Sequence, residues 1–218
     1  MAFDTQILDL VNNSDFNDQV AMDGWATDAV KEIINILPPK LKQKCSKVTN
    51  LYIDNTNTTM DLDDAGEILY VTRENANSGY YIGCREISPL LADSANDSSS
   101  LNYATATDPV YWTESNSSGH PTLFVLPTPT AAQPAKIIHI SYPTVDVNVD
   151  STINNFPNEA EYLVVLYVAI KVAESLLVSE EDIELFAPII GTLKQDYDKG
   201  IQMLVAQGIP QPQQREGR

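Results

Sequence analysis

The stretch that most constrains the fold is a long apolar run from Asn154 to Val178, NNFPNEAEYLVVLYVAIKVAESLLV. From Tyr162 to Ile170 every residue is apolar. A surface helix carries one apolar stripe, so a helix that is apolar on nearly every side must be buried on nearly every side. It is either a core helix surrounded by its own chain or a helix covered partly by neighbouring copies. Charges interrupt the run, and a membrane span needs about 20 apolar residues, so we do not expect a membrane helix.

The residues before the run predict where this helix begins. Pro157 is tolerated in a first turn, and Asn158 can cap a helix. Glu159 and Glu161 would face the positive end of the helix dipole. We expect the centre of the helical core to contain Leu163, Leu166, Ile170 and Ala173, packed against Ile33, Ile34 and the apolar residues between Phe186 and Leu204.

Two further helices are predicted near the start of the chain. Residues 3–12 place apolar side chains on one side and end at Asn12, Asn13 and Ser14. A second helix runs from about residue 15 or 16 to Leu37, because its apolar residues recur at spacings of three and four. Pro38 and Pro39 end it, since proline lacks the amide that a helix interior needs.

A lysine cluster follows the second helix. Four of the thirteen basic residues, Lys40, Lys42, Lys44 and Lys47, fall within eight positions. The pattern is consistent with a solvated turn of short helix, with contact to nucleic-acid phosphates, or with contact to an acidic patch on a partner. In so acidic a chain that partner could be the next copy of the same protein.

From Val48 to about Pro143 the helical period disappears, and β-branched and aromatic residues gather between turns rich in Asn, Asp, Gly, Ser and Pro. Short connections of this kind favour antiparallel hairpins that form a small sheet or barrel. One helical turn is expected from Ser88 to Asp93, and a loop over residues 92–100. The predicted strands are Val48–Ile53, Glu67–Arg73, Tyr80–Ile87, Val110–Glu114, Thr122–Leu126 and Ala135–Tyr142.

The last predicted helix begins after Ser179 and carries an apolar stripe from Ile183 to Leu204. Pro188 should kink or restart it. Gly200 interrupts the stripe, which indicates a close approach of another backbone there. We expect the helix to end at Gly208 and to be followed by an extended C-terminal arm, because IPQPQQREGR has no apolar face.

These elements predict an α+β fold in which a helical bundle carries an inserted antiparallel β-rich region. The expected division is a helical bundle over 1–46 and 151–207, a β-rich insertion over 47–150 and an extended arm over 208–218. The helices at the two ends of the chain should therefore pack together.

Charge and motifs exclude several classes of function. The net charge of -17 opposes nucleic-acid binding of the usual basic-patch kind. His120 and His139 have no second histidine or cysteine at metal-ligand spacing, and the glycine after Asp61, Asp63 and Asp64 stands at the wrong place for a calcium loop. No nucleophile elbow, P-loop or dinucleotide fingerprint occurs. We expect no enzyme activity, no metal and no cofactor. The two cysteines predict free thiols in a reducing compartment, and MAFDTQILDL does not read as a signal peptide.

The order of several segments resembles the head-to-tail adaptor (connector) proteins of tailed bacteriophages, which are virion structural proteins. A strand ends near an acid, a second runs into a Pro-x-Pro turn, a third ends in Tyr-Pro, and an apolar helix begins with Glu-Ala-Glu-Tyr. The segments are DPVYWTE (Asp108–Glu114), LFVLPTPT (Leu123–Thr130), AKIIHISYPTV (Ala135–Val145), NFPNEAEYLVVLYVAIK (Asn155–Lys171) and, near the start, WATDAVKEIINILPPKL (Trp25–Leu41).

The resemblance implies a homo-oligomeric ring of about twelve copies beneath the portal, in the neck between capsid and tail. Its implied partners are the portal protein, a tail or nozzle protein and, transiently, the genomic DNA that passes through; no membrane is implied. A channel wall of negative charge would let DNA slide past without sticking. The virion would be its final location and the host cytoplasm its place of synthesis.

We expect the interfaces of such a ring in the lysine cluster and in the C-terminal arm. Two alternatives remain open: another neck or tail-completion ring, and a soluble β-rich binding module that uses Tyr111, Trp112 and Tyr142 as recognition aromatics. The expected interface residues are Lys40, Lys42, Lys44, Lys47, Ile209, Pro210, Gln211, Pro212, Arg215 and Arg218.

Overall fold

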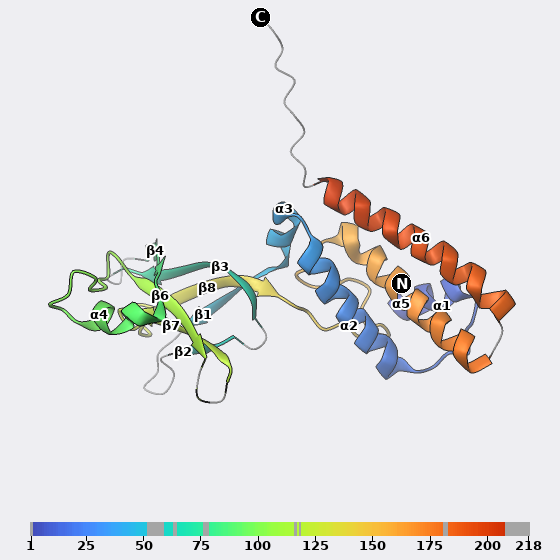
Figure 1. The fold of residues 1–218 in the computed structure, drawn as a ribbon, viewed down its shortest axis with the longest axis horizontal. Coiled ribbons are helices and arrows are strands. Elements are labelled where there is room, and N and C mark those ends of the chain that lie inside the picture. Colours follow the sequence, from blue (N-terminus) through green and yellow to red (C-terminus); the bar gives the residue numbers. More distant parts are fainter. Residues whose placement is uncertain are drawn as a thin grey trace, which may run out of the picture. The chain divides into compact units, whose positions relative to one another are not determined.

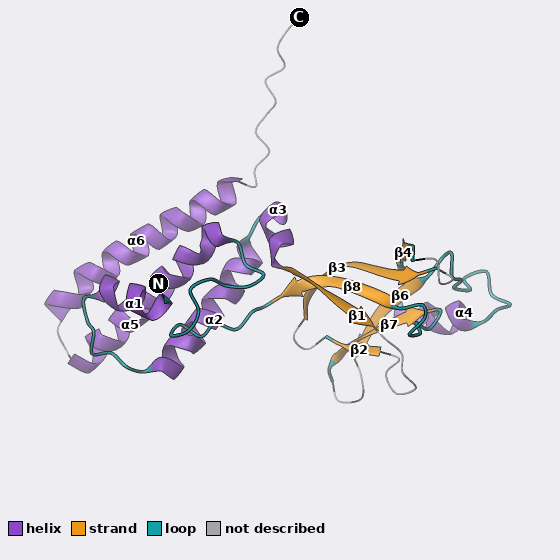
Figure 2. Cartoon of the chain, turned by 180° about the vertical axis from the view of Figure 1, so that it is seen from behind, coloured by secondary structure: helices purple, strands orange, loops and turns teal. Residues whose placement is uncertain are grey.

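The chain divides into a helical unit, Met1–Cys45 with Tyr142–Arg218, and a β unit, Ser46–Ser141 (Figure 1). The computed structural model describes residues 2–51, 59–62, 65–75, 79–115, 117, 119–180 and 183–207. Both classes of secondary structure occur: the described strands all lie in the β unit, which also contains two short helical segments, and the long helices lie in the helical unit (Figure 2). The expected α+β class is therefore confirmed.

The helical unit is built around α5, Asn158–Glu180, which packs against α1, α2 and α6. Leu163 and Ala173 are fully buried and Ile170 nearly so. The expectation for Leu166 was wrong, because this residue is only half-buried. It lies one turn from Tyr162, which is 45% exposed although its hydroxyl lies against Gly200 of the last helix, so this part of α5 is only partly covered. Within the chain, α5 packs against three helices of its own unit, and the expectation that neighbouring copies cover part of it stays a prediction.

By length and composition α5 is also apolar enough to cross a membrane, contrary to the expectation from its interrupting charges. The segment that passes this test is Asn158–Ser179, and half of its most apolar window is buried inside the unit. Its burial against three helices of the same chain accounts for its apolar character without a membrane.

The helices around α5 begin and end at the residues that the sequence marks. They are α1, Phe3–Val11, and α2, Gln19–Ile36, whose N-cap residue Asp18 accepts a hydrogen bond from the amide of Ala21 at 3.1 Å. The start of α2 is thus three or four residues later than expected. Pro38 then begins the short helix α3, Pro39–Lys42, followed by the 3-10 turn η1, Gln43–Cys45.

Helix α6, Ile183–Gln207, crosses α5 at Gly200. A Cβ atom at Gly200 would collide with Leu163 Cδ2 and stand 2.5 Å from Tyr162 Oη, so the close approach at this glycine is made by side chains of α5 and not by its backbone as expected. The helix does not restart at Pro188, which lies inside it. Phe186, Leu193 and Leu204 are buried as expected, whereas Ile183 is 64% exposed at the first turn.

An irregular segment, residues 142–157, joins the β unit to α5 and ties α1 to α2. The amide of Val147 donates to Asp23 Oδ1 in α2 at 2.9 Å, while its carbonyl accepts from the amide of Asp4 in α1, also at 2.9 Å. Ile153 and Phe156 are buried further along the segment. These contacts make residues 142–157 part of the helical unit.

The β unit contains two four-stranded sheets and no barrel. The first sheet, in the order β1-β8-β3-β4, is antiparallel; the second, in the order β2-β7-β6-β5, ends in a short parallel pair between β5 and β6. The strands are β1 (Ser46–Leu51), β2 (Thr59–Asp61), β3 (Ala65–Glu74), β4 (Tyr81–Gly83), β5 (Arg85–Glu86), β6 (Val110–Ser115), β7 (Pro121–Leu126) and β8 (Ala135–Ser141).

Alternation along β6 and β7 sends side chains to two small cores. Leu123 and Val125 join Val71 and Ile137 in a cluster shared with the first sheet. Phe124 and Leu126 of β7 point the other way and pack with Val110 and Trp112 in a second cluster. This cluster lies under η2 (Pro89–Leu91) and α4 (Ala92–Asn96). The second sheet is therefore covered on both faces.

Three sequence-based expectations for this unit were wrong. The strand expected over Tyr80–Ile87 is two strands in different sheets, because the amide of Cys84 donates to Val71 in β3 while that of Arg85 donates to Pro109. Strand β2 was not expected, and α4 replaces part of the loop expected over residues 92–100.

Candidate functional site

The structure assigns the lysine cluster to both units. Lys40 and Lys42 lie in α3 and Lys44 in η1, all in the helical unit, whereas Lys47 lies on β1 of the β unit. Lys40, Lys44 and Lys47 are exposed and Lys42 is half-buried. Strand β1 is an edge strand of its sheet, a position where lysine is common because it discourages uncontrolled strand pairing.

Lys44 already has an acidic partner within its own chain. Its Nζ donates to Oε1 of Glu159 in the first turn of α5, and this hydrogen bond holds the pKa of Glu159 below the usual range. Both side chains remain solvated, at 52% and 39% exposure, so the pair is a weak link. Glu161 is engaged too, since its Oε1 accepts from the amide of Ile153 at 2.8 Å.

The other half of the expected interface falls at the end of the chain. Residues 208–218, which include Ile209, Pro210, Gln211, Pro212, Arg215 and Arg218, lie outside the described residues. Gly208, the expected end of α6, lies there as well. The described part of α6 extends to Gln207.

The structure places one of the two histidines, His139, within the first sheet of the β unit. His139 is buried; its Nδ1 donates to the carbonyl of Ile140 at 2.9 Å, and its Nε2 is 3.1 Å from Thr49 Oγ1. Both ring nitrogens are thus engaged, as expected for an ordinary strand residue. Among the described residues no group of three His, Cys, Asp or Glu side chains is placed to hold a metal ion. Asp63 and Asp64 lie outside the described residues.

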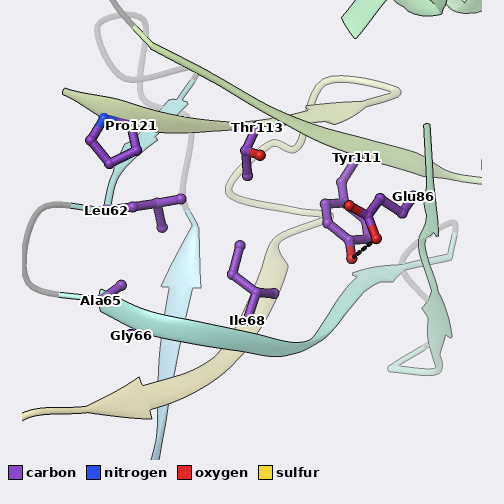
Figure 3. Close-up of a pocket in the computed structure, with 8 residues that line it drawn as sticks. All are labelled: Leu62, Ala65, Gly66, Ile68, Glu86, Tyr111, Thr113 and Pro121. Atoms are coloured by element: carbon purple, nitrogen blue, oxygen red, sulfur yellow. Dashed lines mark hydrogen bonds between the residues drawn. The ribbon is translucent and has the colours of Figure 1, made fainter. Parts of the chain in front are cut away.

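A hollow of about 360 Å³ opens between the two sheets (Figure 3). A side-chain hydrogen bond in it runs from Tyr111 Oη to Glu86 Oε2 at 3.3 Å. Burial, and then the charge of Glu86, raises the pKa of Tyr111, so its phenol stays protonated and does not act as a base. The remaining lining residues are Leu62, Ala65, Gly66, Ile68, Thr113 and Pro121.

The aromatics considered for ligand recognition have structural partners. Trp112 is 8% exposed and stacks on Phe124 with ring centroids 5.1 Å apart. Tyr142 donates its hydroxyl to Asn35 Oδ1 of α2 at 2.9 Å. These contacts favour packing over ligand recognition for both residues.

Comparison with known families decides the identity of the chain. The model of the SU10 adaptor protein family matches residues 3–215, which is nearly the whole chain. The chain belongs to this family. The resemblance to phage head-to-tail adaptors inferred from segment order is thereby confirmed. No curated protein matches the chain.

As an SU10 adaptor protein, the chain is a phage structural protein with a place in the virion. An adaptor works by contacting other head and tail proteins and by oligomerising, so its functional sites are surfaces. The lysine cluster stays a predicted interface, and sequence reasoning missed Glu159 as the partner of Lys44. It also missed the exposed Leu90 and Leu101, whose only signal was two large apolar residues inside a Ser- and Asp-rich stretch.

Proposed function

We propose that this adaptor forms the neck ring that joins the portal to the tail, with about twelve copies around a channel for genomic DNA. The observation that carries the proposal is the family match over residues 3–215. The net charge of -17 supports it, because a wall of like charge repels DNA phosphates and leaves the genome free to slide. The portal on one side and a tail or nozzle protein on the other are the partners.

The proposed role is structural and involves no catalysis and no cofactor. Membership of an adaptor family supports this. The engaged ring nitrogens of His139 and the protonated phenol of Tyr111 also support it, since neither group is placed as a base.

Two segments are proposed as the interfaces of the ring. Residues 208–218 carry two arginines, two prolines and no apolar stripe, and we assign them to the portal. Lys40, Lys42 and Lys47 face acids of a neighbouring subunit or of the portal. Lys44 contributes less, because Glu159 of its own chain already neutralises it.

The test of the proposal is binding to the portal protein of the same phage, followed by electron microscopy of the complex. A ring of adaptors seated on the portal is the expected result. A chain lacking residues 208–218 should keep its thermal stability, because no described core contact is removed, and should dock on the portal at least tenfold more weakly. Equal affinity of the full and shortened chains would remove this segment from the interface.

A charge reversal tests the lysine cluster. Lys40→Glu, Lys42→Glu and Lys44→Glu together should impair assembly without unfolding the subunit, and added salt should partly restore it by screening the new repulsion. The matched control reverses Lys31, Lys194 and Lys199, three exposed lysines elsewhere in the helical unit. If both triple variants assemble alike, net charge matters and the position of these lysines does not.

A further inference from the structure

The hollow between the two sheets of the β unit has a polar end and an apolar end (Figure 3). Glu86 and Tyr111 stand together at one end, and Leu62 and Pro121 stand at the other. Its volume of about 360 Å³ lies near the lower limit of the range for ligand pockets, which is about 300–1,000 Å³. A hollow of this size suits a small molecule or one long side chain of another protein.

The apolar end of the hollow continues the core of the β unit. Leu62 is 7% exposed and belongs to the cluster that both sheets share, and Ile68 packs against the same cluster. Thr113 and Pro121, which also line the hollow, are exposed, so the hollow is open to solvent. Apolar walls that can be reached from solvent favour a ligand with an aliphatic part.

The polar end carries a negative charge that the described residues leave unpaired. The hydroxyl of Tyr111 donates to Glu86 Oε2 at 3.3 Å, and within the described ranges no lysine, arginine or histidine forms an ion pair with Glu86. Arg85, its neighbour in β5, is paired with Asp108 instead, because successive side chains of a strand point to opposite faces. An unpaired carboxylate in a chain of net charge -17 attracts a cation.

Tyr111 adds two properties to the polar end. Burial, and then the charge of Glu86, raises its pKa, so the phenol keeps its proton and its hydroxyl holds one oxygen of the carboxylate in place. Its ring also lines the hollow, so a cation bound to Glu86 would lie close to an aromatic ring. A planar guanidinium both pairs with carboxylates and stacks on aromatic rings, whereas an ammonium group is a compact point charge. The polar end therefore suits arginine better than lysine.

We propose that this hollow binds an arginine side chain of another virion protein, with the guanidinium at Glu86 and the aliphatic stem along Leu62 and Ile68. Proteins of the adaptor family contact other head and tail proteins, and these supply the arginine. The inference rests on membership of that family and not on the proposed ring.

A second copy of the chain is a poorer source of the arginine. The chain has four arginines in all. Arg73 is buried and makes three hydrogen bonds within the β unit, and Arg85 is paired with Asp108. The other two, Arg215 and Arg218, belong to the segment already assigned to the portal.

The first experiment measures binding of N-acetylarginine amide to the full chain by ligand-observed NMR, which works at any oligomeric state. N-acetylcitrulline amide has the same shape but a neutral urea group, and it should bind about fivefold more weakly or worse. Methylguanidinium keeps the charge but lacks the stem, and it should also bind about fivefold more weakly or worse. The inference is overturned if the arginine compound does not bind, or if it binds no better than the citrulline compound.

Three variants test where the arginine compound binds. Glu86→Gln should weaken binding about fivefold. Its matched control, Glu114→Gln, removes the same charge from an exposed position of β6 outside the hollow and should bind like the unmodified chain. Thr113→Trp should fill the hollow and abolish binding. All three native side chains are exposed, so each variant should keep the thermal stability of the unmodified chain.

Two results with these variants would overturn the inference. An equal loss of binding in Glu86→Gln and Glu114→Gln would show a general effect of charge. Normal binding to Thr113→Trp would show that the arginine compound does not enter the hollow.

Tyr111 acts in this proposal as a positioning residue, and Tyr111→Phe tests that role because it keeps the ring and removes the hydroxyl. Alone it should weaken binding about twofold to threefold. Combined with Glu86→Gln it should cause no further loss, because the hydroxyl acts through the carboxylate. A further loss in the double variant would overturn the positioning role.

The last experiment identifies the protein that supplies the arginine. The portal protein and the tail protein of the same phage are each titrated with the unmodified chain, Glu86→Gln and Glu114→Gln. One of the two should bind Glu86→Gln about fivefold more weakly than the other two forms, and an excess of N-acetylarginine amide should compete with it. If neither protein is affected, no partner arginine enters the hollow. Failure of the chain to form a ring on the portal would leave the results with N-acetylarginine amide unchanged, so the two proposals fail separately.

Discussion

In the helical unit one helix, α5, supplies more buried residues than any other element, whereas in the β unit the buried residues are split between two small clusters on opposite faces of one sheet. The helical unit also contains a tight contact at Gly200, where a Cβ atom would collide with side chains of α5. The β unit instead buries polar groups, Arg73, Thr122 and His139. Changes of side-chain volume should therefore damage the helical unit most, and losses of polar contacts should damage the β unit most.

The chain carries a natural reporter in each unit. Cys45 lies at the end of η1 in the helical unit and Cys84 lies between β4 and β5 in the β unit, and both are free thiols. Burial raises the pKa of Cys45 to about 11 and that of Cys84 to about 12, so neither forms the reactive thiolate readily in the folded protein. Pulsed alkylation along a denaturant series, resolved by peptide mass, reports the unfolding of each unit.

The largest effect is expected from Leu163→Ala. Leu163 is fully buried where α5 meets α6, and truncation of such a residue costs about 2–5 kcal/mol of unfolding free energy. Cys45 should become reactive at lower denaturant than in the unmodified chain, while the midpoint for Cys84 stays unchanged. Leu166→Ala, on the half-buried side of the same helix, is the matched control with a smaller shift. Equal shifts at both cysteines would show that the two units unfold together.

A somewhat smaller effect, confined to the other unit, is expected from Arg73→Met. The Arg73 guanidinium is buried and donates to Pro127 O at 2.7 Å, Glu74 O at 3.0 Å and Gln133 Oε1 at 3.0 Å. Hydrogen bonds from a charged donor contribute about 1.5–3 kcal/mol. The unfolding free energy reported by Cys84 should fall by about that amount, and the denaturant midpoint for Cys84 should fall with it. Arg85→Met serves as control, because its ion pair with Asp108 is exposed. If the midpoint for Cys84 is unchanged, these bonds do not hold the β unit together.

Gly200→Ala sharpens the claim that volume dominates in the helical unit. The added methyl group would meet Leu163 and Tyr162, and overpacking of this kind costs about 1–3 kcal/mol. The same change at Gly191, where a Cβ meets nothing within 4 Å, should raise stability by about 0.5–1 kcal/mol. Thermal unfolding of both variants measures the difference, and a gain at both glycines would show that helix propensity outweighs the contact at Gly200.

The smallest effect belongs to the solvated pair Lys44–Glu159. Because the folded state lowers the pKa of Glu159, the stabilisation is present above the ordinary carboxyl pKa of about 4.3 and is lost as pH falls through the folded value. Lys44→Met should cost less than about 1 kcal/mol at pH 7, given the exposure of both side chains. Chemical denaturation should show a smaller difference in unfolding free energy between Lys44→Met and the unmodified chain at pH 3 than at pH 7. A difference in unfolding free energy that is larger at pH 3 would contradict a stabilising ion pair between Lys44 and Glu159.

The sequence predicted the helical unit better than the β unit for a physical reason. Helix period, proline positions and the gap at Gly200 are local signals, and each corresponds to an observed feature. The division of Tyr80–Ile87 depends on hydrogen bonds to Val71 and Pro109, which are distant in sequence. The exposure of Leu166 likewise depends on which side of α5 its neighbours leave open.

Prediction of the site was limited in the same way. The lysine cluster is visible as a run of charge, but its partner Glu159 lies 115 residues further along the chain. The exposed leucines at residues 90 and 101 show no period, because they lie in turns. Surfaces that contact other proteins leave no packing pattern in the isolated chain, so sequence pattern finds them only where charge or composition is unusual.

The helical unit is assembled from both ends of the chain, and this sets the order of events during synthesis. The ribosome completes the β unit before α5 and α6 have emerged. Until then, α1 and α2 lack α5, the helix against which they pack. Any chain released early therefore lacks a finished helical unit. An incomplete subunit would expose the apolar sides of α1 and α2 to proteases and chaperones, so the topology itself screens unfinished copies before they reach an assembling virion.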